Sequence, residues 1–254
     1  MKHYEKLIEL GCFTRQQLAE VTGSDAAATA CIYGYLKKGY IERIRHNLYA
    51  TISLESKIPI LNRFQIGSHL FPDAYLSHHS AFEVYGCANQ VFNEIYVSTK
   101  SRFKDFEYDM ARYHRIAPKR NPAIIQEGGM IYTSPEQTVI DSICDFEKIG
   151  SGGLEETLRC MMLMPALDND KLLDVLKQYN NGFLYQKTGY MLEEMNDDFD
   201  LPDSFFNECL KHIPHSKRYF TKEMNRLVFN KKWKLYVPMS LQKITAKGVD
   251  YDAF

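Results

Sequence analysis

The feature that most constrains the fold of this chain is a cluster of helix signals in residues 13–25, FTRQQLAEVTGSD. Thr14 is a good N-cap residue, and Gln17 three positions later can complete a capping box. Phe13 and Leu18 occupy the two positions of a hydrophobic staple. These signals predict a helix of barely two turns that ends at Gly23.

Two further helices and a hairpin are predicted around this short helix. One helix is expected over residues 3–10, and another over residues 25–38, with Ser24 as its cap. Residues 40–50, YIERIRHNLYA, alternate like a short hairpin with His46-Asn47 as its turn. Three short helices followed by a basic hairpin form the pattern of a winged helix-turn-helix, whose third helix enters the major groove of DNA.

The expected outer face of the third helix is suited to contact with a duplex. It begins with alanines, which allow the backbone to approach the bases, and Thr29 and Tyr33 can hydrogen-bond to base edges or phosphates. Basic side chains at the helix end and on the hairpin would position the protein on phosphates without reading sequence. The alternative, a helical interaction module with a solvated charged hairpin, remains open at this point.

The next segment, residues 58–195, is predicted to be a larger mixed α+β domain. Strands are expected over residues 93–99, 108–117 and 130–133. A helix with a strong start follows, because Ser134 can cap it and Gln137 can complete a capping box. Amphipathic helices then continue to residue 195, so helices are concentrated at the end of the domain.

The stretch YLSHHSAFEVYG, residues 75–86, invites an interpretation as a catalytic or metal site. A helix explains it better, with Ser77 as the N-cap and His78 and His79 at the first two helical positions. Adjacent helical residues project about 100° apart and are poorly placed to bind one metal ion. We therefore expect a structural element here, with no catalytic residue, metal or cofactor.

Composition excludes several classes of protein. Lys and Arg total 31 against 32 Asp and Glu, so net charge suggests no partner. The N-terminus does not resemble a signal peptide, and no apolar run is long enough to span a membrane. The six cysteines are scattered without a CxxC pair, which favours reduced thiols in the cytoplasm.

Known enzyme motifs are incomplete in this chain. Gly67-Ser68 lacks the Asp-x-Asp that a nucleotidyltransferase needs downstream, and Asp250-Tyr251-Asp252 lacks the upstream Gly-Ser. Pro72-Asp73 is not followed by the Glu-x-Lys of a restriction-type nuclease, and Gly150-Ser151-Gly152-Gly153 lacks the ending of a phosphate loop. We expect no enzyme, although a nuclease or nucleotidyltransferase relative, or a pure protein-interaction module, remains as an alternative.

The C-terminal extension, residues 196–254, is expected to be mainly helical and to pack on the second domain, and it segregates its charges. An acidic block at 193–208 precedes a basic block at 211–234. The basic block could contact nucleic acid, pair with the acidic block or be solvated. The possible secondary patch consists of Lys217, Arg218, Lys222, Arg226, Lys231 and Lys232.

An ordered set of motifs over about residues 10–195 resembles the AbiEi-type antitoxins, winged-helix transcriptional regulators of type IV toxin–antitoxin and abortive-infection systems. The matching stretches are FTRQQLAEVTGS, LKKGYIERIRHNLYA, YLSHHSAFEVYG, IYVST, TSPEQTVIDSI and GYMLEE. The resemblance implies a winged helix over residues 1–52 that binds and represses the operon's own promoter. It also implies that the rest of the chain counters a nucleotidyltransferase-like toxin without a stable complex, as part of phage defence.

By position, the resemblance places the DNA contacts on the third helix and the wing. The residues are Thr29, Tyr33, Lys37, Lys38, Arg43, Arg45 and His46.

Overall fold

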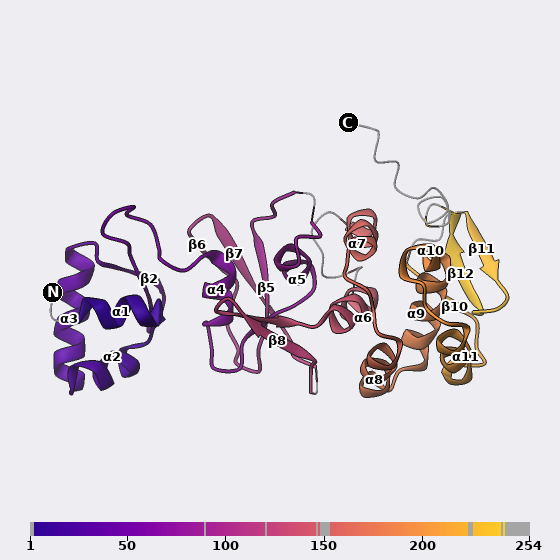
Figure 1. Cartoon of the computed structure of the whole chain (residues 1–254), viewed down its shortest axis with the longest axis horizontal. Helices are drawn as coiled ribbons and strands as arrows, with labels where there is room; N and C mark the ends of the chain where they lie inside the picture. Colours follow the sequence, from indigo (N-terminus) through magenta and orange to yellow (C-terminus); the bar gives the residue numbers. More distant parts are fainter. Residues whose placement is uncertain are drawn as a thin grey trace.

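The computed structural model describes residues 3–88, 90–119, 121–145, 147, 153–222, 226–239 and 241. The molecule is elongated, with a helical unit and a small sheet at one end, a larger sheet in the middle and helices with a further small sheet at the other end (Figure 1). The sequence-based fold class, a winged helix followed by a mixed α/β part with a helical C-terminal portion, is confirmed.

The N-terminal unit is a winged helix. Its elements are α1 (Tyr4–Leu10), β1 (Cys12–Phe13), α2 (Arg15–Thr22), α3 (Asp25–Lys37), β2 (Ile41–Arg45) and β3 (Leu48–Thr51). The capping box of Thr14 and Gln17 is formed, Gly23 ends α2 with a φ of 86°, and Ser24 caps α3. Phe13 and Leu18, the predicted staple pair, are both fully buried in the core of this unit. Local signals therefore determined this part of the fold.

The middle unit is a six-stranded sheet in the order β6-β7-β5-β4-β9-β8. Its elements are α4 (Arg63–Ser68), β4 (Tyr75–Leu76), α5 (His79–Val84), β5 (Glu94–Ser98), β6 (Phe106–Tyr108), β7 (Ala111–Ile116), β8 (Ile124–Glu127) and β9 (Met130–Thr133). The strand expected over residues 108–117 is present as β7, but its first residues belong to a hairpin that was not predicted. Asp109 and Met110 both have positive φ and form a tight turn, so the chain makes a β6–β7 hairpin there. Strand β8 was not predicted.

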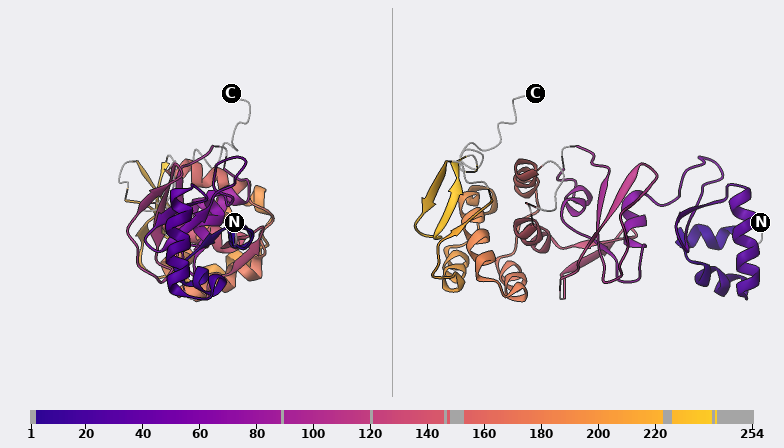
Figure 2. Two further views of the ribbon diagram at one scale, coloured as in Figure 1. Left: turned by 90° about the vertical axis from the view of Figure 1, so that its left-hand side faces the viewer. Right: turned by 180° about the vertical axis from the view of Figure 1, so that it is seen from behind.

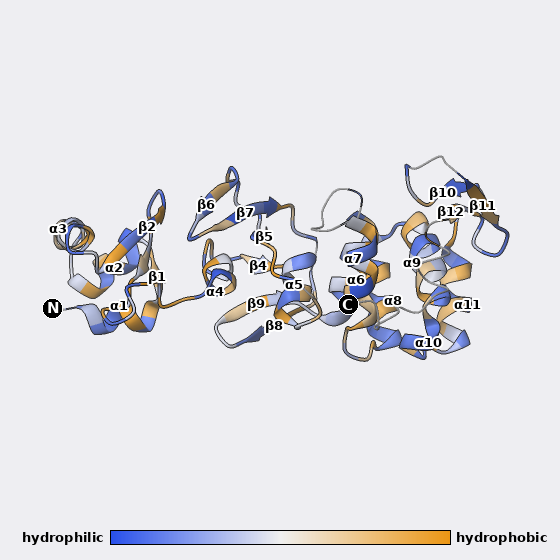
Figure 3. Cartoon of the chain, turned by 90° about the horizontal axis from the view of Figure 1, so that it is seen from above, coloured by the Kyte–Doolittle hydropathy of each residue, from blue (hydrophilic) through white to orange (hydrophobic). Residues whose placement is uncertain are grey.

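The C-terminal unit combines helices with a three-stranded sheet, β10-β12-β11. Its elements are α6 (Pro135–Asp145), α7 (Gly153–Met162), α8 (Asn169–Tyr179), α9 (Gly182–Glu194), α10 (Asn196–Phe199), α11 (Asp203–His212), β10 (Arg218–Tyr219), β11 (Leu227–Asn230) and β12 (Leu235–Pro238). Figure 3 shows apolar and hydrophilic residues alternating along α6, α8 and α11, as expected of helices that bury one face.

The hydrophobic core of this unit crosses residue 195. It extends from Phe82 and Ile140 through Leu192 to Phe205 and Trp233. The segment after residue 195 therefore shares a core with the helices before it. In this segment the chain also forms the β10-β12-β11 sheet.

A second core joins the winged helix to the middle sheet. Ile44, Leu48 and Ala50 from the hairpin pack in one cluster with Ile66 and Leu76 of the middle unit. Tyr108 adds a polar contact, donating its hydroxyl to a carboxylate oxygen of Glu42 at 3.1 Å. The hairpin is thus buried against the sheet, and the two units form a continuous structure.

Candidate nucleic-acid interface

Helix α3 lies at the extremity of the molecule, away from the middle sheet (Figure 2). Ala28 and Ile32 face the core, whereas Thr29, Tyr33 and Lys37 are exposed. Tyr33 keeps 74% of its surface in solvent, an unusual position for a large aromatic side chain. The small and polar outer face that the sequence predicted is therefore open to a partner along the length of α3.

The wing is a β2–β3 hairpin with the predicted two-residue turn. Asn47 has a φ of 58°, and its side-chain oxygen accepts a hydrogen bond from the Arg15 backbone N–H at 3.1 Å. The Arg15 guanidinium also forms an ion pair of 2.9 Å with Asp25, the first residue of α3. Arg15 therefore joins the wing turn to the start of α3. Sequence reasoning missed this residue, because nothing local links it to partners 10 and 32 positions away.

The two wing arginines have different surroundings. Arg43 is exposed, with its guanidinium carbon 5.7 Å from the ring centre of Tyr49. Arg45 is half-buried, 4.4 Å from the ring centre of Phe71 and 5.7 Å from that of Phe103. Burial lowers the pKa of Arg45 from its ordinary value. Arg45 thus contacts the middle unit, whereas the other six residues predicted to bind DNA are exposed.

The adjacent histidines form a buried structural element. His78, at the N-cap of α5, has a φ of 55°, and no side chain caps the helix. The expectation that Ser77 caps α5 was wrong, because its hydroxyl bonds instead to His78 Nδ1 and to Ser98, both at 2.8 Å. Burial lowers the pKa of His79 to about 4, so its ring is neutral and packs edge-on to Phe92 with ring centres 4.3 Å apart.

A polar network connects His78 to the helical unit. His78 Nε2 lies 3.6 Å from Asp145 Oδ2, and Lys119 Nζ lies 3.4 Å from the same oxygen. These neighbours hold the pKa of Asp145 below its usual range, despite its burial. The network therefore joins the middle sheet to α6 through charged groups.

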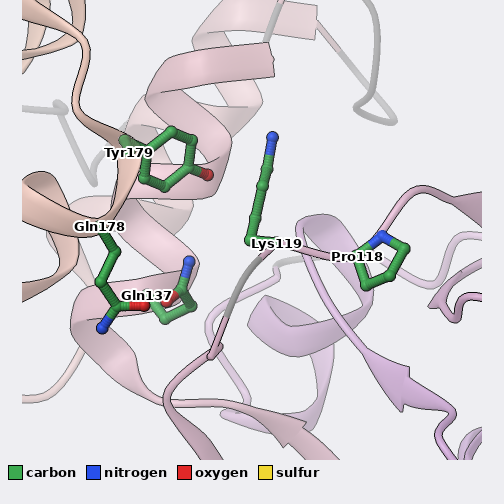
Figure 4. Close-up of a pocket in the computed structure, with 5 residues that line it drawn as sticks. All are labelled: Pro118, Lys119, Gln137, Gln178 and Tyr179. Carbon is green, nitrogen blue, oxygen red and sulfur yellow. The ribbon is translucent and has the colours of Figure 1, made fainter.

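A second carboxylate on α6 lies next to a small pocket. Asp141 accepts hydrogen bonds from Gln137 at 2.6 Å and from the hydroxyl of Tyr179, and burial raises its pKa. The predicted capping box at α6 is therefore only half formed. The backbone N–H of Gln137 donates to the Ser134 hydroxyl, as expected, but the Gln137 side-chain amide donates to Asp141. The adjoining cavity has a volume of about 240 Å³. Figure 4 shows the residues that line it, Pro118, Lys119, Gln137, Gln178 and Tyr179.

The described residues contain no group of three or more His, Cys, Asp or Glu side chains that could hold a metal ion. Within the same residues, no helix is long and apolar enough to cross a bilayer. The Asp250-Tyr251-Asp252 motif and all but the last glycine of the 150–153 stretch lie outside the described residues.

The basic C-terminal block is divided between different environments. Lys232 pairs with Glu193 of the acidic block. Arg218 lies over the ring of Phe183 on α9, at 5.9 Å. Lys217 lies over the ring of Phe229 on β11, at 4.9 Å. The two blocks thus pair at Lys232, and Lys222, Arg226 and Lys231 are exposed.

Comparison with known proteins finds a family match in the N-terminal unit and a similar fold for the whole chain. The family described as "Transcriptional regulator, AbiEi antitoxin" matches residues 6–52, so the resemblance inferred from motifs is confirmed for the winged helix. The crystal structure of the RV2827C protein from Mycobacterium tuberculosis superposes with a TM-score of 0.61 at 14% identity, covering 97% of this chain and 94% of that chain. The two proteins therefore share a fold over nearly their whole length. Among curated proteins, none matches the sequence.

Proposed function

We propose, from the AbiEi-type regulator domain at residues 6–52, that this chain is a DNA-binding repressor of its own promoter and the antitoxin of a type IV toxin–antitoxin operon. The observation that carries the proposal is the open outer face of α3, with Tyr33 at 74% exposure, beside a basic wing. Such a helix can enter the major groove while the wing contacts phosphates. We place the protein in the cytoplasm, acting by binding and not by catalysis.

The proposed contacts have two roles. Thr29 and Tyr33 face the bases, and Lys37, Lys38, Arg43 and His46 contact phosphates. Arg45 places its guanidinium against Phe71 and Phe103, so we propose that it orients the wing as well as adding charge. The Arg15 link from Asn47 to Asp25 supports the proposal, because it fixes the distance between wing and helix before DNA binds.

The test measures binding to a labelled duplex from the region upstream of the gene. Arg43→Ala should weaken binding on every sequence alike and lower the salt slope by about 1, because a phosphate contact is lost. Tyr33→Ala should weaken binding to the promoter more than binding to random duplex, since it removes a group that faces the bases. Lys171→Ala, an exposed change on α8, is the matched control and should change neither quantity. Equal affinity of the wild-type chain for promoter and random DNA would refute a specific repressor.

The antitoxin half of the proposal needs a separate test. Co-expression with a nucleotidyltransferase-like toxin from the neighbouring gene should restore growth, and size-exclusion chromatography of the two proteins should show no stable complex. Restored growth should persist in the Arg43→Ala variant if repression and protection are separate activities. Loss of growth with the wild-type chain, at matched toxin levels, would contradict the antitoxin role.

A further inference from the structure

The small C-terminal sheet carries a row of aromatic rings across all its strands. Tyr219 on β10 is the register partner of Tyr236 on β12, which in turn is the partner of Phe229 on β11. The ring centres of Tyr219 and Tyr236 lie 5.0 Å apart with planes at 21°, and those of Phe229 and Tyr236 lie 4.8 Å apart. The three rings therefore form one continuous stack.

This row lies on the face of the sheet that points away from the core. Leu235 and Val237, which flank Tyr236 on the central strand, are fully buried, and side chains alternate between faces along a strand. Tyr219 ends the row on an edge strand and keeps 47% of its surface exposed. The stack thus begins inside the sheet and ends at a ring that is open to solvent.

The surroundings of the row are strongly basic. Residues 213–222 and 226–239 contain seven Lys and Arg and no Asp or Glu, although Lys232 pairs with Glu193 and Arg218 lies over Phe183 on α9. Lys217 lies directly over Phe229 at 4.9 Å, so at least one cation is held at the row itself. Lys231 is exposed just beyond the end of β11. Stacked rings within a field of positive charge suit a ligand that carries both flat rings and phosphates.

We propose that the outer face of the β10-β12-β11 sheet binds single-stranded nucleic acid. A nucleobase extends the stack at Tyr219, while Lys217 and the neighbouring cations contact the backbone phosphates. Single strands fit better than a duplex, because paired bases hide their faces in their own stack. The charge favours a polyanion over an apolar protein partner.

This surface is separate from the proposed promoter interface. Helix α3 and the C-terminal sheet lie at opposite ends of the molecule (Figure 1). The inference therefore does not rest on promoter binding, and either activity can fail without the other.

The experiment measures fluorescence anisotropy of a labelled single-stranded oligonucleotide, about twelve uridines or thymidines long, titrated with the full chain. Saturable, salt-sensitive binding is expected. Tyr219→Ala should weaken it about tenfold, because stacking on one base is lost, whereas Tyr219→Phe should retain it. Lys217→Gln should lower the salt slope by about 0.7, the value for one phosphate of a single strand.

Two comparisons make the result decisive. Tyr33→Ala should impair promoter binding but not single-strand binding, and Tyr219→Ala should do the reverse. Because Tyr219 is half exposed, the Tyr219→Ala protein should keep a circular dichroism spectrum and an unfolding midpoint close to those of the wild type. Equal single-strand affinity of wild-type and Tyr219→Ala proteins would overturn the proposal. Displacement of the single strand by an equal concentration of random duplex would also overturn it.

Discussion

At the scale of single residues, the tightest constraint lies where helix α9 meets the only tryptophan of the sequence. A Cβ atom added at Gly189 would lie 2.1 Å from the ring of Trp233, which is fully buried. Trp233 is also fixed by polar contacts, since its ring N–H donates to Glu193 and its carbonyl accepts from Gln186. The ring cannot retreat without breaking these bonds, so glycine is required at this position.

We therefore predict that Gly189→Ala destabilises the protein by about 3 kcal/mol or more, because the added methyl overpacks a rigid site. The measurement is urea unfolding followed by tryptophan fluorescence. Gly34→Ala is the matched control, because nothing lies within 4 Å of a Cβ at Gly34 on α3. That control should stabilise the chain slightly, since alanine has the higher helix propensity. If Gly189→Ala changes the free energy of unfolding no more than Gly34→Ala does, the ring can move to accept the methyl group.

The buried His79 gives stability a dependence on pH. Its folded-state pKa is about 4 against an ordinary value of 6.5, so the unfolded chain binds the proton first as pH falls. Its contribution is fully present above pH 6.5 and is lost as pH falls toward 4, by up to about 3 kcal/mol. Urea unfolding at about pH 7 and about pH 5 should show this loss. His79→Leu should reduce the difference between the two pH values, and an unchanged difference would contradict the assignment.

At the scale of elements, the sequence predicted helices better than strands, for a local reason. The caps of α2 and α3 are short-range signals, and Thr14 and Ser24 both accept the backbone hydrogen bonds expected of them. Hairpin β6–β7 carries no such signal. Its turn residues Asp109 and Met110 adopt the φ > 0 conformation without the usual asparagine or glycine, so the segment reads as one strand.

The strained turn leads to a prediction. Met110 has a φ of 60° and is 87% exposed, so its side chain gains little from packing. Met110→Gly should stabilise the hairpin by about 1 kcal/mol, because glycine adopts this conformation without steric cost. Thermal unfolding provides the measurement. Met239→Gly, at another exposed methionine for which no positive φ occurs, should not stabilise the chain. A lower melting temperature for Met110→Gly would contradict the argument.

At the scale of the whole molecule, the continuity between winged helix and sheet could not be predicted from sequence. Ile44 and Leu48 lie on the wing hairpin, yet they pack in one core with residues of the middle unit. The same long-range packing brings Arg45 against Phe71 and Phe103, two rings far along the chain. Residue type and spacing predicted the charged residues of the candidate site. Which of them are exposed, as Arg43 is, and which pack against the middle unit, as Arg45 does, depends on tertiary packing.

This continuity predicts that the winged helix and the middle sheet unfold together. Ile44→Ala should cost about 2–4 kcal/mol, because it leaves a cavity in the shared core. Hydrogen exchange should then accelerate in both α2 and β5, and not in α2 alone. Ile8→Ala, at a half-exposed position of α1, should have little effect on either element. Faster exchange confined to the winged helix would show that the two units open independently.

The shared core also determines how far the molecule can reach. Since the hairpin is packed into the sheet and the helices continue that packing to the far end, the separation between α3 and the C-terminal sheet is set by folding and not by a tether. A protein docked on a promoter through α3 would then hold its other end at a fixed offset from the duplex. Any strand captured there would experience an effective concentration that depends on whether its own length spans that offset. The molecule would then select ligands by the distance they can span as well as by their chemistry.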